Sequence, residues 1–484
     1  MLRWISKFFH GGISGDQFLG VANSVQSAKD VDLRVNGRQV VLANKPVRNA
    51  SAVIADWIMD FVTIQATGDV IAFGDTGKIY RQAAGTGSFV LVYTDSSNRK
   101  ITDAYEYNSY LYWATSQYLH RIPVANIDAS WVITTDVAEN YKTFTNTNAT
   151  HHPMLEVYNN LYIGDGKSLA ELLPSMIWDP VKLNIFGDET ITNLTFNGSY
   201  IRIYARRTNK VPYSRCYLWD GVSDDYNQFF SFRGMAVHAV AEKASFDVVL
   251  AGERPVLLAS TGLDYQVLKQ MPGFPGSNSA TFNHNCMTAG ESLVYFGATE
   301  SGTNIMNRGV WSWGSKDKDY PQTLGNEYTT SNGSATDCVA ATHYSGGHIY
   351  FGWKNGSTYG IDEVNLSLYE PTGEIVTRAW DGGAANQKKE IVAARMAFKK
   401  LADGEQIDLF LRRNLDTTWG SSVLTAAYSD TADRNINYKE LPTNAIGDPF
   451  NFIEAKVQLT AGTNHGTTPT LTDLVIDSDF IEVL

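Results

Sequence analysis

The stretch Val294-Tyr295-Phe296-Gly297 is one of seven short apolar and aromatic runs in this chain that end in Gly or Ala. The other six are Val70-Ile71-Ala72-Phe73-Gly74, Leu111-Tyr112-Trp113-Ala114, Leu161-Tyr162-Ile163-Gly164, Ile201-Arg202-Ile203-Tyr204-Ala205, Val248-Val249-Leu250-Ala251 and Ile349-Tyr350-Phe351-Gly352. Their closing small residues recur every 40 to 55 residues. A four-stranded propeller blade takes roughly 40 to 50 residues. The spacing therefore predicts an all-β chain that contains a seven-bladed β-propeller.

A second β-type run follows each of these runs after a short polar gap, as in Lys78-Ile79-Tyr80-Arg81 and Val310-Trp311-Ser312-Trp313. Several gaps contain Gly beside Asp or Asn, such as Asp165-Gly166 and Asn355-Gly356. These residues adopt the positive φ angles that tight hairpin turns require. Each unit is therefore expected to contain an antiparallel hairpin. The alternative is an all-β protein with irregular strands, since such runs also occur in sandwiches.

The repeat divides the chain into three parts. Residues 1–50 lack it and are expected to form an N-terminal arm and a strand that closes the propeller ring by pairing with the last blade. Residues 51–387 are expected to form the blades. From residue 388 apolar side chains alternate with polar ones, as in Ala455-Lys456-Val457-Gln458-Leu459, which predicts a small C-terminal β-sandwich over residues 388–484. The alternative is that these strands complete a single domain.

Composition excludes some classes of function. The 484-residue chain has a net charge of −12 and no run of Lys or Arg typical of a nucleic-acid patch. The sequence contains no stretch of about 18 apolar residues, so no membrane span is predicted. Residues 1–10 lack the apolar core and cleavage site of a secretory signal. Three widely spaced cysteines, Cys216, Cys286 and Cys338, are expected to be buried thiols of a protein made in a reducing cytoplasm.

Candidate catalytic and metal-binding residues form no recognisable motif. Carboxylates are adjacent at Asp224-Asp225 and Asp362-Glu363, but a glycosidase needs two acids that face each other across a substrate. The neighbours His151-His152 would point to opposite faces of a strand, and His343 with His348 flanks a predicted turn. No nucleophile elbow, phosphate loop or dinucleotide fingerprint is present. The sequence therefore predicts no enzyme, no catalytic residue, no cofactor and no metal site.

One small basic cluster comprises Arg202, Arg206, Arg207 and Lys210, interleaved with Tyr204 and Tyr213. Such a cluster could contact phosphates or an acidic sugar. The alternative is a solvated hairpin face, which the small size of the cluster favours.

Four segments carry a resemblance to a known family. They are Gly11-Gly12-Ile13-Ser14-Gly15-Asp16, Gly74-Asp75-Thr76-Gly77-Lys78-Ile79-Tyr80-Arg81, residues 107–123 and residues 152–166. Together they resemble a group of tailed-bacteriophage virion proteins of the β-propeller type, which are encoded among tail and structural genes. The resemblance covers residues 11–270. The C-terminal part resembles in outline the small β-sandwiches that phage tail proteins append for assembly contacts.

The resemblance implies a structural, non-enzymatic role in the virion tail, with the protein made in the bacterial host cytoplasm. In architecture it is similar to the nozzle proteins of short-tailed phages. The implied partners are other tail proteins and further copies of the chain in an oligomeric ring, past which DNA moves without specific binding. The negative net charge agrees with this role, because a negative wall repels DNA.

Two other classes of function stay open. An open propeller face rich in Tyr and Trp could bind a host-surface glycan, because aromatic rings stack on sugars. The protein could also be a glycan depolymerase whose acids the sequence does not reveal.

The N-terminal segment contains three large apolar residues, Trp4, Phe8 and Phe9, without a blade of its own to bury them. Exposed aromatic side chains on a short polar segment are typical of a docking site. We therefore expect these residues to form a docking arm for a neighbouring subunit. The alternative is that they fold back onto the propeller.

Overall fold

The computed structural model describes residues 2–6, 9, 11–14, 17–18, 24–35, 39–49, 54–84, 87–128, 130–132, 135–146, 149–207, 213–243, 246–253, 255–271, 282–298, 309–316, 322–334, 337–430, 436–441 and 449–481. The chain forms two compact units. The propeller unit comprises Val47–Val310 and Thr330–Glu363. The sandwich unit comprises Met1–Pro46, Trp311–Thr329 and Val364–Leu484, so it also includes most of the last two strands of the sixth propeller sheet and parts of the last propeller sheet. No helix within the described ranges has the length and apolar character needed to cross a membrane.

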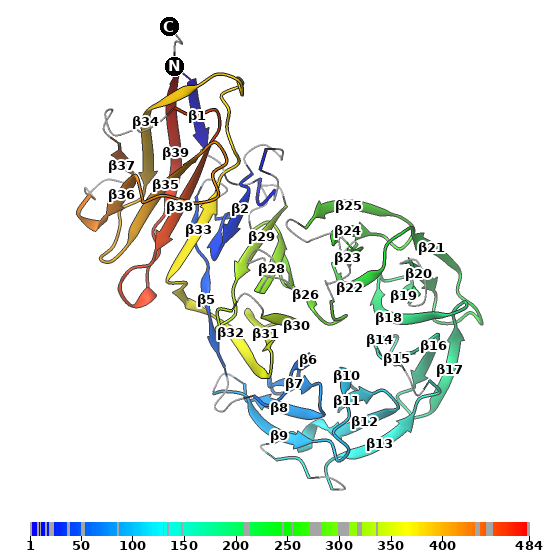
Figure 1. Ribbon diagram of the computed structural model, residues 1–484. Helices are drawn as coiled ribbons and strands as arrows, with labels where there is room; N and C mark the ends of the chain where they lie inside the picture. The colour runs from blue at the N-terminus through cyan, green and yellow to red at the C-terminus, as the bar shows by residue number, and fades with distance from the viewer. Residues whose placement is uncertain are drawn as a thin grey trace. The chain divides into compact units, whose positions relative to one another are not determined.

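Seven four-stranded sheets among the described residues form the propeller, and Figure 1 shows them following one another around a ring. Blades 1 to 4 contain the following strands in order: β6 (Ile58–Thr63), β7 (Val70–Gly74), β8 (Lys78–Gln82), β9 (Val90–Thr94); β10 (Ile101–Tyr107), β11 (Tyr110–Thr115), β12 (Tyr118–Pro123), β13 (Ala138–Thr143); β14 (Met154–Val157), β15 (Asn160–Asp165), β16 (Ser168–Leu172), β17 (Trp178–Asn184); β18 (Glu189–Phe196), β19 (Ile201–Arg207), β20 (Tyr213–Trp219), β21 (Gln228–Phe232). Blades 5 to 7 contain β22 (Val237–Glu242), β23 (Asp247–Ala251), β24 (Val256–Ser260), β25 (Tyr265–Gln270); β26 (Met287–Ala289), β27 (Leu293–Ala298), β28 (Gly309–Gly314), β29 (Thr323–Tyr328); β30 (Cys338–Ser345), β31 (His348–Asn355), β32 (Thr358–Tyr369) and β5 (Asn44–Arg48). A short 3-10 helix, η1 (Val124–Asn126), follows β12.

The predicted propeller fold is confirmed, and the seven apolar runs of the sequence are the second strands of the seven blades. The small residue that closes each run has a packing reason. A Cβ atom on Gly164 would lie 2.8 Å from Ile191 of β18, and one on Gly352 would lie 2.5 Å from Ile58 of β6. Each of these neighbours belongs to the next blade. A larger residue would therefore push adjacent blades apart.

The N-terminal segment supplies the fourth strand of the last blade, because β5 lies next to β32. Asn49 continues this connection: its N–H donates to the carbonyl of Ile361 (2.8 Å), and its carbonyl accepts from the N–H of Phe89 in blade 1 (3.3 Å). Strands from both ends of the propeller sequence therefore share one sheet, which joins the first and the last parts of the ring.

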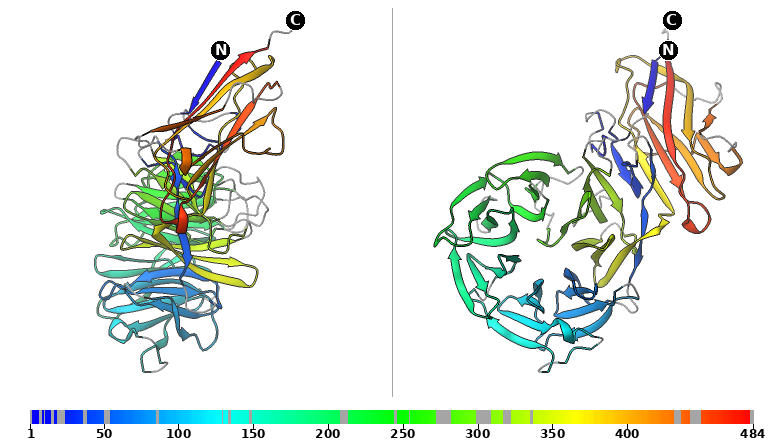
Figure 2. Two further views of the ribbon diagram at one scale, coloured as in Figure 1. Left: turned by 90° about the vertical axis from the view of Figure 1, so that its left-hand side faces the viewer. Right: turned by 180° about the vertical axis from the view of Figure 1, so that it is seen from behind.

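The sandwich unit contains two main sheets and a short ribbon. The four-stranded sheet has the order β1 (Leu2–Ser6), β39 (Leu471–Phe480), β34 (Lys389–Phe398), β37 (Asn437–Glu440). The five-stranded sheet has the order β2 (Ser27–Lys29), β33 (Thr372–Val376), β38 (Ile453–Thr460), β35 (Gln406–Arg413), β36 (Leu424–Ala427). The ribbon pairs β3 (Val31–Asp32) with β4 (Val41–Leu42), and the helices η3 (Tyr428–Asp430) and η4 (Thr463–His465) lie in connections. Figure 2 shows these sheets from two further sides.

The boundaries expected for this part of the chain need correction. The sandwich begins before residue 388, since β33 lies within its five-stranded sheet. Residues 1–50 are also more than an arm, because β1 pairs with β39 and β2 pairs with β33. Such pairings join segments more than 340 residues apart. The alternation of apolar and polar residues within a short strand does not indicate which distant strand it pairs with.

We expect Trp4 of β1 to stabilise the sandwich unit. Its ring is half-buried and stacks on Trp380, with 6.5 Å between ring centroids. Trp4→Ala should lower the free energy of unfolding by about 2 kcal/mol, measured by urea titration with far-UV circular dichroism. The matched control is Ile5→Ala, whose side chain is exposed on the next position of the same strand and should cost less than about 1 kcal/mol. Equal losses in the two variants would contradict this role of Trp4.

Candidate functional site

Polar side chains gather around the axis of the propeller. The first strand of each blade contacts the first strand of the next, and β30 contacts β6 to complete the circle. Five of the nine histidines of the chain lie on these inner strands or within three residues before them, namely His151, His152, His238, His284 and His343. Histidine-rich inner strands make the axis the first place to examine for chemistry.

Residues 282–286, which lead into β26 of blade 6, bond to blades across the axis. The Asn285 side-chain amide donates to the carbonyls of Met59 in blade 1 (3.3 Å) and Thr102 in blade 2 (3.2 Å). In blade 4, the amide of Asn193 donates to the carbonyl of His284 (3.3 Å). The described axis is therefore filled at this level by a segment that ties several blades together.

Two aspartates and the histidines make up the rest of this axial cluster. Asp103 accepts hydrogen bonds from His284 Nε2 (2.7 Å) and from the backbone N–H of His152 (2.8 Å). Asp60 accepts from the backbone N–H groups of Phe61 and Ala104, both at 2.8 Å. Burial, together with the nearby Asp103, raises the pKa of Asp60 well above its ordinary value of 3.8.

Burial keeps His151, His238 and His343 neutral. It lowers the pKa of His238 and of His343 to about 4 and lowers that of His151 well below its ordinary value. His343 is hydrogen-bonded to Thr63 Oγ1 (2.7 Å), and His238 Nε2 to the carbonyl of Gly252 (2.9 Å). His238 and His343 thus act in structural bonds between neighbouring segments. Nowhere in the described ranges are three His, Cys, Asp or Glu side chains grouped to hold a metal ion.

The carboxylates and histidines considered from the sequence do not form one site. Asp224 and Asp225 are exposed, whereas Asp362 is buried and accepts from Ser331 and from Trp353 Nε1 (2.9 Å). Glu363 pairs with His348 (2.7 Å) and not with Asp362. The sequence analysis overlooked Asp60, Asp103, His284 and Asn285. The polar run Asn283-His284-Asn285 directly before a strand was the available signal for this segment.

The basic cluster on blade 4 is not a solvated face throughout. Arg202 is buried and forms an ion pair with the buried Asp247 (2.8 Å). Arg207 pairs with Asp188 (2.8 Å) at the surface, and Lys210 lies outside the described residues. Arg202 therefore serves the interior of the blade and is not available to phosphates.

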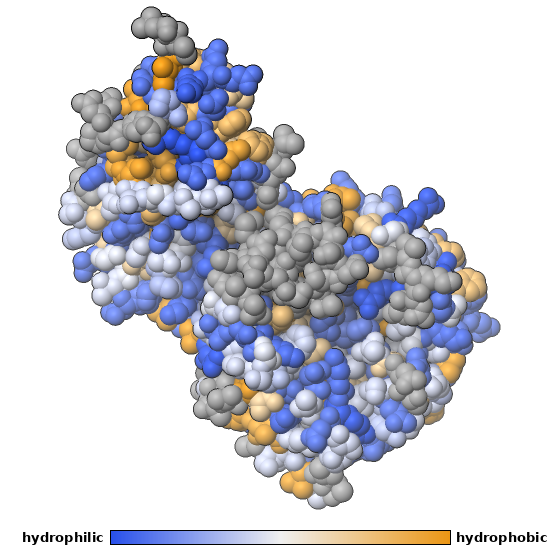
Figure 3. Space-filling view, in the orientation of Figure 1, coloured by the Kyte–Doolittle hydropathy of each residue, from blue (hydrophilic) through white to orange (hydrophobic). Residues whose placement is uncertain are grey.

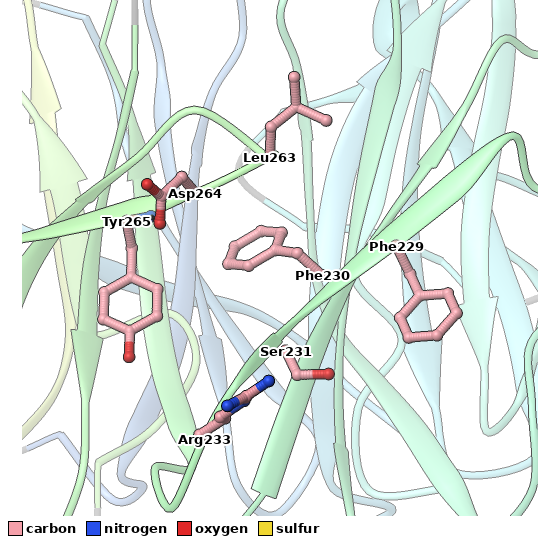
Figure 4. Close-up of a pocket in the computed structure, with 7 residues that line it drawn as sticks. All are labelled: Phe229, Phe230, Ser231, Arg233, Leu263, Asp264 and Tyr265. Atoms are coloured by element: carbon pink, nitrogen blue, oxygen red, sulfur yellow. Dashed lines mark hydrogen bonds between the residues drawn. The ribbon is translucent and has the colours of Figure 1, made fainter.

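A groove at the rim of the propeller is the best candidate for ligand binding. It has a volume of about 580 Å³ and lies between the outer strands of blades 4 and 5. Its lining residues, drawn in Figure 4, are Phe229, Phe230, Ser231, Arg233, Leu263, Asp264 and Tyr265. In the close-up, Phe230 and Tyr265 stand on neighbouring strands with Asp264 and Arg233 near them. Elsewhere, the face seen in Figure 3 is largely hydrophilic, with apolar residues in small groups.

The aromatic residues of the expected docking arm are not free. Trp4 is a strand residue stacked on Trp380, and Phe9 is fully buried. Phe8 lies outside the described residues. Because Trp4 and Phe9 already have partners within this chain, the prediction of a projecting arm is corrected for both of them.

Comparisons with known proteins add little beyond the fold. No protein-family profile matches the chain, and no curated protein matches it. Among solved structures, a catalytically inactive variant of virginiamycin B lyase from Staphylococcus aureus with quinupristin is similar at 10% identity, over 66% of this chain and 99% of that one, with a TM-score of 0.46. The Pan2 WD40 domain of Neurospora crassa (7% identity, 68% and 98% covered, TM-score 0.44) and Raptor of Chaetomium thermophilum (10%, 67% and 30%, 0.46) are also similar. Likeness at this level carries no argument about function.

The neutral histidines predict a loss of stability in acid. In the folded protein His238 and His343 stay neutral down to a pKa of about 4, whereas in the unfolded chain they take up protons near 6.5. The free energy of unfolding should therefore fall as the pH is lowered from 6.5 to 4. Urea titrations across this range measure the slope.

The variant His343→Gln keeps a hydrogen-bonding group toward Thr63 but cannot titrate, so its slope should be shallower than that of the wild type. His348→Gln is the control, because His348 is half-exposed and pairs with Glu363 at the surface. If His343→Gln keeps the full slope of the wild type, the axial histidine is not a source of the acid sensitivity.

Proposed function

We propose that this protein is a non-enzymatic structural component of a tailed-bacteriophage virion tail, where it forms part of a ring with other tail proteins and further copies of itself. The observation that supports this role most directly is the filled axis. Several of the polar groups near the axis, where a propeller enzyme would present them to a substrate, are engaged here in bonds between blades, such as Asn285 to Met59 and Thr102. Such bonds between blades are typical of a structural scaffold.

The filled axis also restricts where DNA can pass. Residues 282–286 occupy the centre of a single propeller, so the conduit of the proposed ring is the space enclosed by several copies. Each copy contributes a net charge of −12 to the protein around this space. A wall of the same sign as DNA prevents adhesion during transit.

A second candidate function, binding of a host-surface glycan, is favoured by the rim groove. Its aromatic side chains Phe230 and Tyr265 can stack on sugar rings, while Arg233 and Asp264 can bond to carboxylates and hydroxyls. Asp264 is the one acid among the described lining residues. Cleavage of a glycan by the usual mechanism needs two acids, so this groove favours binding over the depolymerase alternative.

The structural role is tested by assembly. Alone, the purified chain should form no closed ring, and it should enter rings only when mixed with the tail proteins encoded beside it. Light scattering gives the mass, and negative-stain electron microscopy shows whether rings are present. A stable trimer formed by the chain alone would argue for an adsorption spike and against this role.

The glycan candidate is tested by titrating purified host-surface polysaccharide into the protein by calorimetry. Tyr265→Ala should weaken binding at least about tenfold, in line with the loss of one stacking aromatic residue. Tyr158→Ala, which removes another exposed tyrosine of the propeller, is the control and should bind as the wild type does. Absence of binding by the wild-type protein rejects this candidate and leaves the structural role intact.

A further inference from the structure

The outer strand of each blade is a sheet edge with backbone groups available for pairing, and proteins protect such edges with charges, proline, bulges or covering segments. Five of the seven outer strands carry proline or charged residues. These are β5 with Lys45, Pro46 and Arg48, β13 with Glu139 and Lys142, β17 with Asp179, Pro180 and Lys182, β25 with Lys269, and β29 with Glu327.

Two outer strands, β9 and β29, are contacted by other segments. The carbonyl of Val92 in β9 accepts a hydrogen bond from the N–H of Trp131 (3.1 Å), and Trp131 itself is buried. The carbonyl of Leu324 in β29 accepts from the N–H of Ile13 (3.3 Å), within the sandwich unit. Both of these edges are thus partly occupied by the chain itself.

Within the part of the chain that the structure describes, the remaining outer strand, β21, has none of these protections. Its sequence, Gln228-Phe229-Phe230-Ser231-Phe232, contains neither charge nor proline, and Phe229 is 43% exposed. Beyond its pairing with β20, the backbone hydrogen bonds of β21 are limited, among the described residues, to one between the Phe232 carbonyl and the N–H of Met235.

The geometry of β21 also suits further pairing. The outer pairs that end in β9, β13, β17 and β25 each contain a register shift. The β20–β21 pair is in continuous register from Ser214↔Phe232 to Leu218↔Gln228. Bulges bend a strand and turn its edge away from a partner, so a regular edge is the one best able to accept another strand.

We infer that the β21 edge binds a second copy of this chain, with the two β21 strands antiparallel. Charged residues before and after β21 favour a second copy of the chain as the partner, and they favour the antiparallel direction. Asp224 and Asp225 precede it, Arg233 follows it, and all three are exposed. In an antiparallel pair the acidic end of each copy lies beside the basic end of the other. A parallel pair would place like charges together.

The register of the pair follows from the middle residue of the strand. If Phe230 lies opposite Phe230, the turn that contains Arg233 of one copy lies beside the bend that contains Asp224 and Asp225 of the other, within reach of a long side chain. The contact is the same in both directions and therefore closes as a two-fold dimer. It goes beyond the proposed function, since a tail role does not depend on it.

Sedimentation velocity over a concentration series tests the dimer, which should be weak because the shared edge is short. Each of the single variants Arg233→Asp and Asp225→Arg should raise the dimer dissociation constant roughly tenfold, because each change replaces two attractions by two repulsions. The double variant Asp225→Arg with Arg233→Asp should restore the wild-type constant. Within one chain these residues lie beyond opposite ends of the five-residue strand β21, which is about 17 Å long, so such rescue requires two chains.

Two further variants control for position. Phe229→Lys puts a charge on the β21 edge and should abolish the dimer. Val267→Lys puts the same charge on the β25 edge, where Val267 is 59% exposed, and should leave it unchanged. Far-UV circular dichroism checks that each variant is folded. A chain that stays monomeric at every concentration overturns the inference and leaves the edge to a strand of another protein. A dimer that ignores both single variants, or that the double variant fails to restore, also overturns it.

Discussion

The hydrogen bonds made by residues 282–286 across the propeller axis are the constraint on which the functional interpretation depends. Asn285 reaches the carbonyls of blades 1 and 2, and the carbonyl of His284 accepts from blade 4. Asn285 is partly buried, and a polar group that stays out of water without such partners costs about 1–3 kcal/mol, so these bonds stabilise the contacts between the blades. The polar groups of residues 282–286 at the centre of this propeller therefore hold blades together.

Because polar groups at the centre of the propeller are engaged in bonds between blades, the surfaces that we propose for recognition of partners lie at the rim. The groove between blades 4 and 5 combines aromatic and charged side chains, and the neighbouring β21 edge is regular and uncharged. The other outer strands are guarded by Lys, Glu, Asp, Arg or proline, or by contacts from Trp131 and Ile13. The two surfaces that we propose for partners therefore lie on one sector of the propeller. Blade 4 differs from the other blades in the edge of its outer strand β21, although its inner strands have the same sequence pattern as those of the other blades.

The sandwich unit shows how distant segments become one domain. Strand β1 pairs along its whole length with β39, and Arg3 forms an ion pair with Asp477 (2.6 Å). Phe9 is fully buried, and Trp4 packs on Trp380. Aromatic residues near a chain terminus suggested a docking arm when considered alone. The partner of Trp4 comes from the last quarter of the sequence, where no local pattern points back to Trp4.

The sequence by itself determined the repeat. The second strand of every blade and the small residue that ends it were evident, because strand, turn and hairpin signals are local and recur at blade length. Glycines such as Gly164 and Gly352 mark the place where the next blade packs. The sequence also predicted an aromatic binding surface, but it did not predict that the candidate groove lies between β21 and β25.

Only the tertiary structure decided the rest. Asp60, Asp103, His284 and Asn285 converge on the axis from separate blades, β1 and β2 join the sandwich, and the β21 edge is left without a bulge or cover. All of these depend on which distant segments pair or pack together. Hydrogen bonding between strands is specified by geometry across the fold and not by neighbouring residues, so the sequence pattern alone does not contain it.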